Sequence, residues 1–556
     1  VRARLPDESD EPIIAKVEAD AQPVIYLAFT SDRMNALELT DYVDRFVVDR
    51  LKNLTGVADV TIFGERRYAM RIWVGRGRLA AYNLTVQDIE SALRTQNVEL
   101  PSGRIESQDR EFTILSRTGL TTPEQFENIV VKLADGYQVK VRARGRVELG
   151  AADTRRDSTF NGKTTVTVGI IKQAVANPLD VSTALREVLP EINDSLPEGM
   201  TSEIGNDSAV FIDRSIKAVY TTILEAVGLV VLVILFFLRT LRASIIPVVT
   251  IPISLIATFA LMYAFGFSIN TLTLLAMVLA IGLVVDDAIV VPENISRHIE
   301  DGMEPLAAAI RGSREIGFAV VAMTLTLAAV YAPIAFSPGR TGRIFLEFAL
   351  TLAGAVIVSG FVALTLTPMM CSKLLKHRSN PGRLYLAVER AFEAFESGYR
   401  SVLRATLRVR WLVILVATGV AGSSAVFFMS LPSELAPVED RGVLQVRGSA
   451  PEGATLSYTG RYARQISQLV AQVPEVASSL LIVGFPDVTD FIAIGRLKDW
   501  AERDVKQQDL AAALTPQLSH IPGVRAFANN PPSLGQRGSS RPVEFVIQTS
   551  GTYEQL

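Results

Sequence analysis

The chain has 556 residues, of which 49% are hydrophobic and 20% charged, and its formal net charge is -3. It therefore lacks the basic excess that would favour a nucleic-acid partner. Its one cysteine, Cys371, excludes an intramolecular disulfide, and its three histidines, His298, His377 and His520, are too scattered to form a metal site. The sequence has no nucleophile–base pairing and no phosphate-binding loop, so we expect no enzyme, no cofactor and no metal.

The N-terminal region alternates strands and helices. Strands are predicted over 23–30, 58–64 and 68–74, and an amphipathic helix over 37–54, where apolar residues recur three and four apart. A second helix should begin after Thr85, because threonine caps helix N-termini. This β-α-β-β-α order is that of a ferredoxin-like (split βαβ) unit.

Short strands dominate the following segment, so we predict a β-rich insertion within the first subdomain. We assign 1–75 to a partial subdomain, 76–158 to the insertion, and 159–216 to the return of the first subdomain.

Six apolar stretches are long enough to cross the hydrocarbon core of a bilayer. They lie at about 221–238, 243–265, 269–292, 316–336, 347–370 and 411–430. The predicted fold class is therefore a polytopic α-helical membrane protein, with a helix bundle over 217–430 and α+β subdomains before and after it in the sequence.

Basic residues predict the orientation of the bundle. Fourteen Lys and Arg residues lie in the loops after the first, third and fifth spans, whereas the two short loops of the other side hold Arg340 and Arg343. The positive-inside rule places the basic loops in the cytoplasm, so the flanking polar regions share the outer side. Segment 380–408 has a helical pattern with basic residues along it and should lie on the cytoplasmic membrane surface.

The strand–helix pattern returns after the sixth span, which indicates an internal duplication. We assign 431–536 to a second subdomain and 537–556 to the truncated start of a further one. Strands are predicted over 442–448, 478–484, 491–497 and 524–529, and helices from Thr455 and over 508–518.

Two adjacent carboxylates, Asp286 and Asp287, follow a stretch from Ala243 to Val285 that contains no charged residue. A carboxylate at bilayer depth costs about 2.5–3.5 kcal/mol and usually faces a bundle interior or a water path. Two neighbouring carboxylates repel each other, so their protons should leave in coupled steps. The pattern predicts a proton relay. The alternative is a helix end whose acids reach headgroup water.

Several motifs resemble those of a known family. They are FGFSINTLTLLAMVLAIGLVVDDAIVVPENISR (265–297), LRASIIPVVTIPISL (241–255), TLTPMMCSKLLK (365–376), GVADVTIFGERRYAMRIWV (56–74), LPSELAPVEDRGVL (431–444) and IGRLKDWAERD (494–504). Through them the chain resembles the resistance–nodulation–division (RND) superfamily, specifically its hydrophobe/amphiphile multidrug efflux pumps of AcrB type, along essentially its whole length.

The resemblance implies proton-driven efflux of hydrophobic or amphiphilic compounds, in the bacterial inner membrane and with large periplasmic porter domains. Asp286 and Asp287 match the proton-carrying aspartates of the family. Phe63 and Phe485 match phenylalanines of its substrate pocket, although a phenylalanine at a strand end is more often a core residue. The insertion over 76–158 would be of docking type. Implied partners are a homotrimer, a periplasmic adaptor protein, an outer-membrane channel and membrane lipid.

Two alternatives stay open at this point: an RND relative that exports lipids or metal ions, and a truncated, non-transporting scaffold. Because the chain begins at Val1 with no span before its first outer region, we expect an internal piece of a longer protein. Pro292 stands where the family usually has valine; it removes the hydrogen bond to the carbonyl of Ala288 and should kink or end the helix. The loop after Phe485 is shorter than the switch loop of typical drug exporters.

Overall fold

The computed structural model describes residues 22–98, 103–114, 119–134, 137–143, 145–238, 241–376, 383–431, 437–531 and 551–552. The chain divides into two compact units. An α+β unit combines Val1–Phe211 with Val438–Leu556, and a helical unit comprises Ile212–Pro437. The predicted start of a further subdomain over 537–556 lies almost entirely outside the described residues.

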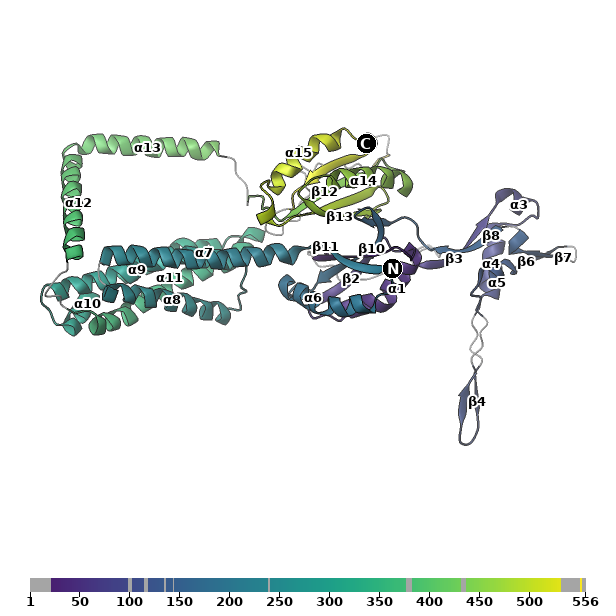
Figure 1. Cartoon of the computed structure of the whole chain (residues 1–556), viewed down its shortest axis with the longest axis horizontal. Coiled ribbons are helices and arrows are strands. Elements are labelled where there is room, and N and C mark those ends of the chain that lie inside the picture. Colours follow the sequence, from purple (N-terminus) through teal and green to yellow (C-terminus); the bar gives the residue numbers. More distant parts are fainter. Residues whose placement is uncertain are drawn as a thin grey trace. The chain divides into compact units, whose positions relative to one another are not determined.

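The first module of the α+β unit is a four-stranded antiparallel sheet (Figure 1). It contains β1 (Ile25–Ser31), β2 (Val57–Phe63), β10 (Lys163–Lys172) and β11 (Met200–Asp207). Strand β10 pairs with β1 and β2, and β1 also pairs with β11. The order is therefore β11-β1-β10-β2.

Helices connect strands of this module that run in the same direction but are not neighbours in the sheet. From β1 the chain runs through α1 (Ala36–Tyr42), the π-helical turn η2 (Val43–Val48) and α2 (Asp49–Lys52) to β2, and α6 (Pro178–Ser195) connects β10 to β11. Asn35 caps the first helix, because its side-chain oxygen accepts hydrogen bonds from two backbone N–H groups of the first turn.

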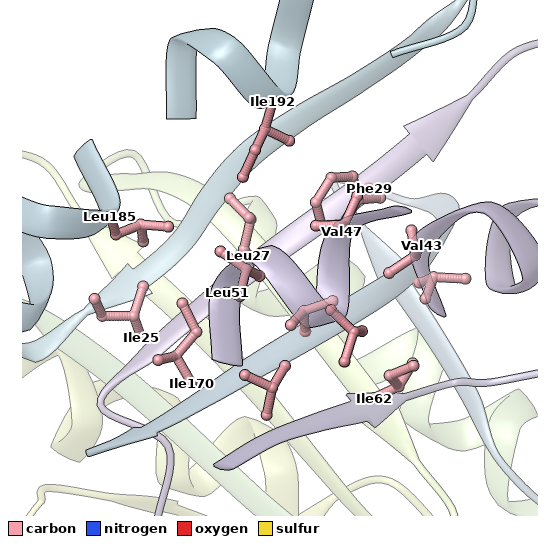
Figure 2. Close-up of a cluster of buried hydrophobic side chains, with 14 of the residues drawn as sticks. Ile25, Leu27, Phe29, Val43, Val47, Leu51, Ile62, Ile170, Leu185 and Ile192 are labelled. Atoms are coloured by element: carbon pink, nitrogen blue, oxygen red, sulfur yellow. The ribbon is translucent and has the colours of Figure 1, made fainter. Parts of the chain in front are cut away.

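Apolar side chains between these helices and the sheet form the core of the module (Figure 2). Ile25, Leu27 and Phe29 alternate along β1 and are each 0% exposed, which places them on one face of the strand. Leu185 and Ile192 of α6 pack against them. The other face of β1, which carries Ala28, points away from these helices.

Strand β3 (Tyr68–Val74) does not belong to this module, contrary to the β-α-β-β-α prediction. It pairs along its length with β8 (Gly145–Ala151) in a separate two-stranded sheet. The second half of the module comes instead from β10, α6 and β11. The local pattern identified the strand, but its partner depends on a segment far along the chain that no local pattern specifies.

The insertion between β2 and β10 has its own small core, to which Phe126, Ile129 and Val147 belong. Helix α4 (Val86–Gln96) begins directly after Thr85, which confirms the predicted cap. The insertion also contains α3 (Arg76–Ala80), β4 (Arg104–Glu106), β5 (Glu111–Thr113), α5 (Pro123–Glu127), β6 (Val130–Ala134), β7 (Tyr137–Lys140) and η3 (Val141–Ala143).

The second module repeats the strand order of the first. Its order is β15-β12-β14-β13, with every pair antiparallel, and α14 (Leu456–Ala471) and α15 (Gln507–Ser519) are its connecting helices. An internal duplication predicts that the two modules have the same strand order. The strands are β12 (Val443–Ser449), β13 (Val476–Val483), β14 (Asp490–Leu497) and β15 (Arg525–Asn529).

The short strand β9 (Asp157–Phe160) joins the two modules into one nine-stranded sheet, because it pairs with both β10 and β13. Ser158 donates its hydroxyl hydrogen toward the carbonyl oxygen of Leu481, 3.1 Å away. Next to it, the side-chain oxygen of Asn161 accepts the N–H of Ser479 at 2.9 Å. The modules are therefore tied by backbone pairing and by specific side-chain hydrogen bonds.

The helical unit contains six helices that are long and apolar enough to cross a membrane, within the part of the chain that is described. Each overlaps one predicted span. The predicted surface segment forms the separate helix α12 (Arg383–Arg408). The spanning helices are α7 (Ser208–Leu238), α8 (Leu241–Ala264), α9 (Thr271–Glu300), α10 (Pro305–Ala335), α11 (Gly339–Leu374) and α13 (Arg410–Ser430) (Figure 1).

Pro292 does not end its helix, so that part of the prediction was wrong. Helix α9 continues through Pro292 to Glu300. Beyond the proline, Ile295 and Ile299 are buried in a cluster with side chains of α8, α10 and α11. Packing by neighbouring helices tolerates a proline that would break an isolated helix.

Candidate functional site

The two adjacent aspartates lie on α9 in different surroundings. Successive residues on a helix point about 100° apart, so neighbouring side chains cannot share one environment. Asp287 is 6% exposed, and Val284 and Ala288 beside it are buried among side chains of α7 and α8. Asp286 is exposed on the described bundle. Of the two, Asp287 alone is enclosed by the described helices.

Asp287 is hydrogen-bonded to a side chain of another helix, Ser359 of α11. The Ser359 Oγ lies 3.1 Å from Asp287 Oδ2 and 3.4 Å from the carbonyl oxygen of Val284, and its single proton can serve one of them at a time. No cation among the described residues forms an ion pair with Asp287. A buried carboxylate with so little compensation is costly as an ion, and taking up a proton removes that cost.

Small residues bring the helices around this carboxylate close together. Ala276 and Ala280 of α9 pack in one buried cluster with Ala355 of α11. On the next turn of α11, a Cβ at Gly360 would lie 2.4 Å from Thr324 Oγ1 of α10. Glycine is therefore required for α10 and α11 to approach as they do, and this approach fixes the serine beside it.

Ser359 was not identified from the sequence. A serine inside an apolar helix usually bonds to a carbonyl of its own preceding turn, so its presence in a span is unremarkable. The contact with Asp287 results from the packing of α9 against α11, which the sequence pattern does not specify.

The two predicted pocket phenylalanines meet at the junction of the two modules. Phe63, at the end of β2, is 4% exposed, and Phe485, in the loop between β13 and β14, is 41% exposed. Their ring centroids are 5.0 Å apart and the rings are edge to face, a favourable aromatic arrangement. The ring centroid of Tyr26 of β1 lies 5.9 Å from that of Phe63.

These rings belong to an apolar layer formed by the faces of both modules that point away from their helices. Buried members include Ala28 from the first module, Phe160 from the joining strand β9, and Leu480, Ile482 and Ile494 from the second module. They alternate along the strands with the residues that face the helices, as strand geometry requires. Phe63 is thus part of a core layer, whereas Phe485 lies at its accessible margin.

Tyr26 brings a polar group, its phenolic hydroxyl, to this layer. Burial raises the pKa of Tyr26 to about 12, and the positive charge of Arg447 on β12 opposes that shift. Tyr26 is therefore a neutral hydroxyl at physiological pH, at the edge of an aromatic surface.

Gly484 fixes the start of the loop that carries Phe485. Its φ is +84°, and a Cβ would lie 2.1 Å from the carbonyl oxygen of Arg155. No other residue fits there without movement of the backbone.

The acidic pair and the aromatic pair belong to different units. Among the described residues, no group of three or more His, Cys, Asp or Glu side chains is arranged to hold a metal ion.

The chain is similar to a known protein family and to a curated protein. A model of the AcrB/AcrD/AcrF family matches residues 1–555. A curated protein of Haemophilus influenzae (strain ATCC 51907 / DSM 11121 / KW20 / Rd), named "Uncharacterized transporter", is 38% identical over 556 residues. The alignment covers all of this chain and 54% of that protein, so the chain spans about half the length of its relative.

Proposed function

Because the chain belongs to the AcrB/AcrD/AcrF family of RND transporters, we propose that it forms part of a secondary active exporter driven by protons. The family and the six candidate spans make it a multi-pass protein of the inner membrane. The proposed cargo is hydrophobic or amphiphilic compounds, which leave the cell in exchange for protons that enter.

The environment of Asp287 is the observation that carries this proposal. A carboxylate buried among membrane helices, with a neutral hydroxyl as its partner, exchanges a costly charged state for a neutral one when it binds a proton. Two protonation states that differ in the cost of burial bias two arrangements of the helices, which is what coupling to transport requires. Asp286, exposed on the same turn, is the proposed second member of the relay.

We assign the two modules of the α+β unit to ferredoxin-like periplasmic porter subdomains, a proposal that their equal strand order supports. Phe63 and Phe485 are the proposed substrate contacts. Because the rings touch in this structure, a ligand between them would have to part them, and aromatic walls suit varied apolar ligands. A homotrimer, a periplasmic adaptor and an outer-membrane channel are the partners that family membership makes the natural proposal.

The test is Asp287→Asn in the complete protein, with Thr258→Val as the control. Thr258 is also fully buried in the bundle, but its hydroxyl bonds to the Ser254 carbonyl of its own helix. We expect Asp287→Asn to abolish proton-dependent dye efflux while membrane levels stay normal, and Thr258→Val to retain it. Unchanged proton-coupled efflux in the asparagine variant would refute the relay.

Cargo class is tested separately in vesicles that contain the unmodified protein. Dyes, phospholipids and divalent metal ions are offered in parallel under the same proton gradient. We expect dye transport; transport of metal or lipid alone would leave the proton step intact and replace the proposed cargo.

A further inference from the structure

A shallow cavity of about 490 Å³, largely open to the surface, lies at the beginning of α10, away from the acidic pair on α9. Its lining residues are Ala307, Ile310, Arg311, Arg314 and Glu315. None of them belongs to the proposed relay or to the aromatic layer.

The sequence predicts that this part of α10 lies near the boundary between lipid headgroups and acyl chains. The predicted apolar span of this helix begins at 316, directly after the two arginines. Arg311, Arg314 and Phe318 follow each other at spacings of three and four residues, so they lie along one side of the helix. Phe318 is 85% exposed and Ile310 is 52% exposed. Two cations thus lie next to an exposed apolar strip.

The carboxylate in the cavity is already neutralised by its neighbours. Glu315 Oε1 accepts a hydrogen bond from Arg311 Nε at 3.1 Å, and Glu315 Oε2 lies 2.7 Å from His298 Nε2 and 3.8 Å from an Arg297 guanidinium nitrogen. His298, on α9, is 7% exposed, so this contact anchors Glu315 from a second helix. Arg311 is held in place by its Nε.

The two arginines of the cavity are exposed and keep hydrogen-bond donors for a ligand. Arg311 keeps its two terminal nitrogen groups, and Arg314 has no ion pair within the described residues. The acidic residues of the turn before α10, Glu300, Asp301 and Glu304, are not among the lining residues. The cavity therefore presents a net positive charge to a ligand.

We propose that this cavity binds the headgroup of an anionic phospholipid from the cytoplasmic leaflet. The phosphate would lie between Arg311 and Arg314, and the acyl chains would follow Ile310 and Phe318. Guanidinium groups bind phosphate through paired hydrogen bonds, and basic pockets on the cytoplasmic side of membrane helices suit anionic headgroups. The adjoining apolar strip favours an amphiphile over a free anion, because a free anion leaves that strip unused. This site is independent of the proposed transport activity.

The experiment measures lipid binding to the purified protein in discs of zwitterionic lipid. Phosphatidylglycerol is titrated in one arm and inorganic phosphate in the other, and bound molecules are counted by native mass spectrometry. We expect saturable binding of phosphatidylglycerol and roughly 30-fold weaker binding in Arg311→Gln/Arg314→Gln. Arg242→Gln removes an exposed arginine at the same membrane face outside the cavity, and it should bind as the unmodified protein does.

Equal phosphatidylglycerol binding by the double variant would overturn the proposal, and so would inorganic phosphate that displaces the lipid at equal concentration. If the glutamine variant fails to fold, Arg311→Lys/Arg314→Lys keeps both charges but loses the paired geometry. It should then show intermediate binding, and binding equal to that of the unmodified protein would refute the assigned phosphate position.

Discussion

Two aspartates, one in each unit, differ in how fully their surroundings compensate their charge: Asp440 is partly buried, and Asp287 is buried. Asp440, in the α+β unit, receives two hydrogen bonds from Arg503, at 2.8 and 2.6 Å, and one from the backbone N–H of Gln507 at 3.1 Å. Asp287, in the helical unit, is bonded to the hydroxyl of Ser359. The first site keeps a charge in place permanently, whereas the second tolerates both protonation states. The presence of a paired cation therefore separates a structural carboxylate from one suited to proton transfer.

The pKa of Asp440 follows from this compensation. Burial would raise the pKa of the carboxyl group, but the hydrogen bonds from Arg503 and from the N–H groups of Gln507 and Gly442 outweigh burial and hold the pKa below its usual value. Asp440 thus stabilises the fold at all pH values above the ordinary aspartate range, and this contribution is lost as the pH falls through its lowered pKa.

The largest effect is expected for Asp440→Asn, compared with Asp287→Asn as its matched substitution. The Arg503 side chain is 2% exposed, so loss of its partner leaves a buried cation uncompensated. We expect about 3–5 kcal/mol of destabilisation in the α+β unit. Asp287→Asn removes a charge that has no cation beside it and should cost nothing measurable at neutral pH. Chemical unfolding of both variants checks this, and equal losses of stability in the two would show that the paired cation does not distinguish the two carboxylates.

The aromatic pair extends the comparison to apolar groups, because Phe63 is enclosed and Phe485 is not. Phe63→Ala should destabilise the α+β unit by about 3 kcal/mol, since it leaves a cavity in the layer between the modules. Phe485→Ala should change stability by less than about 1 kcal/mol, because 41% of the side chain is already exposed. In transport assays we expect Phe485→Ala to raise the KM for dyes without loss of folded protein. An unchanged KM would leave Phe485 without a substrate role.

The sequence predicted elements better than it predicted partners. Six spans, the cap at Thr85 and the strand–helix alternation of both modules follow from local periodicity, because hydrophobic spacing and capping act over a few residues. The pairing of β3 with β8 and the joining strand β9 depend on segments far apart in the chain. Pro292 is a second case in which local sequence is insufficient, since tertiary packing preserves a helix that the local rule for proline would end.

For the candidate site too, the sequence predicted residues but not their contacts. The acidic pair was visible because charge is rare in an apolar stretch, and Phe63 and Phe485 were identified through family resemblance. Their unequal exposure was not predictable from residue type, nor was the contact between the two rings. Ser359 was missed because a serine in a span has a default partner in its own backbone.

Ser359→Ala should have the smallest effect on stability and isolates the hydroxyl from the carboxylate. It removes one hydrogen bond and a single oxygen atom, so we expect a loss of about 1 kcal/mol or less. Because the serine hydroxyl stabilises the charged form of Asp287, its loss should move the pH of half-maximal transport upward while the maximal rate persists. The measurement is proton-coupled dye efflux across a pH series, with Ser254→Ala as the control, since the Ser254 hydroxyl bonds within its own helix. A profile identical to that of the unmodified protein would mean that Ser359 supports only the packing of α9 against α11, and that the proton on Asp287 is governed by groups elsewhere in the protein.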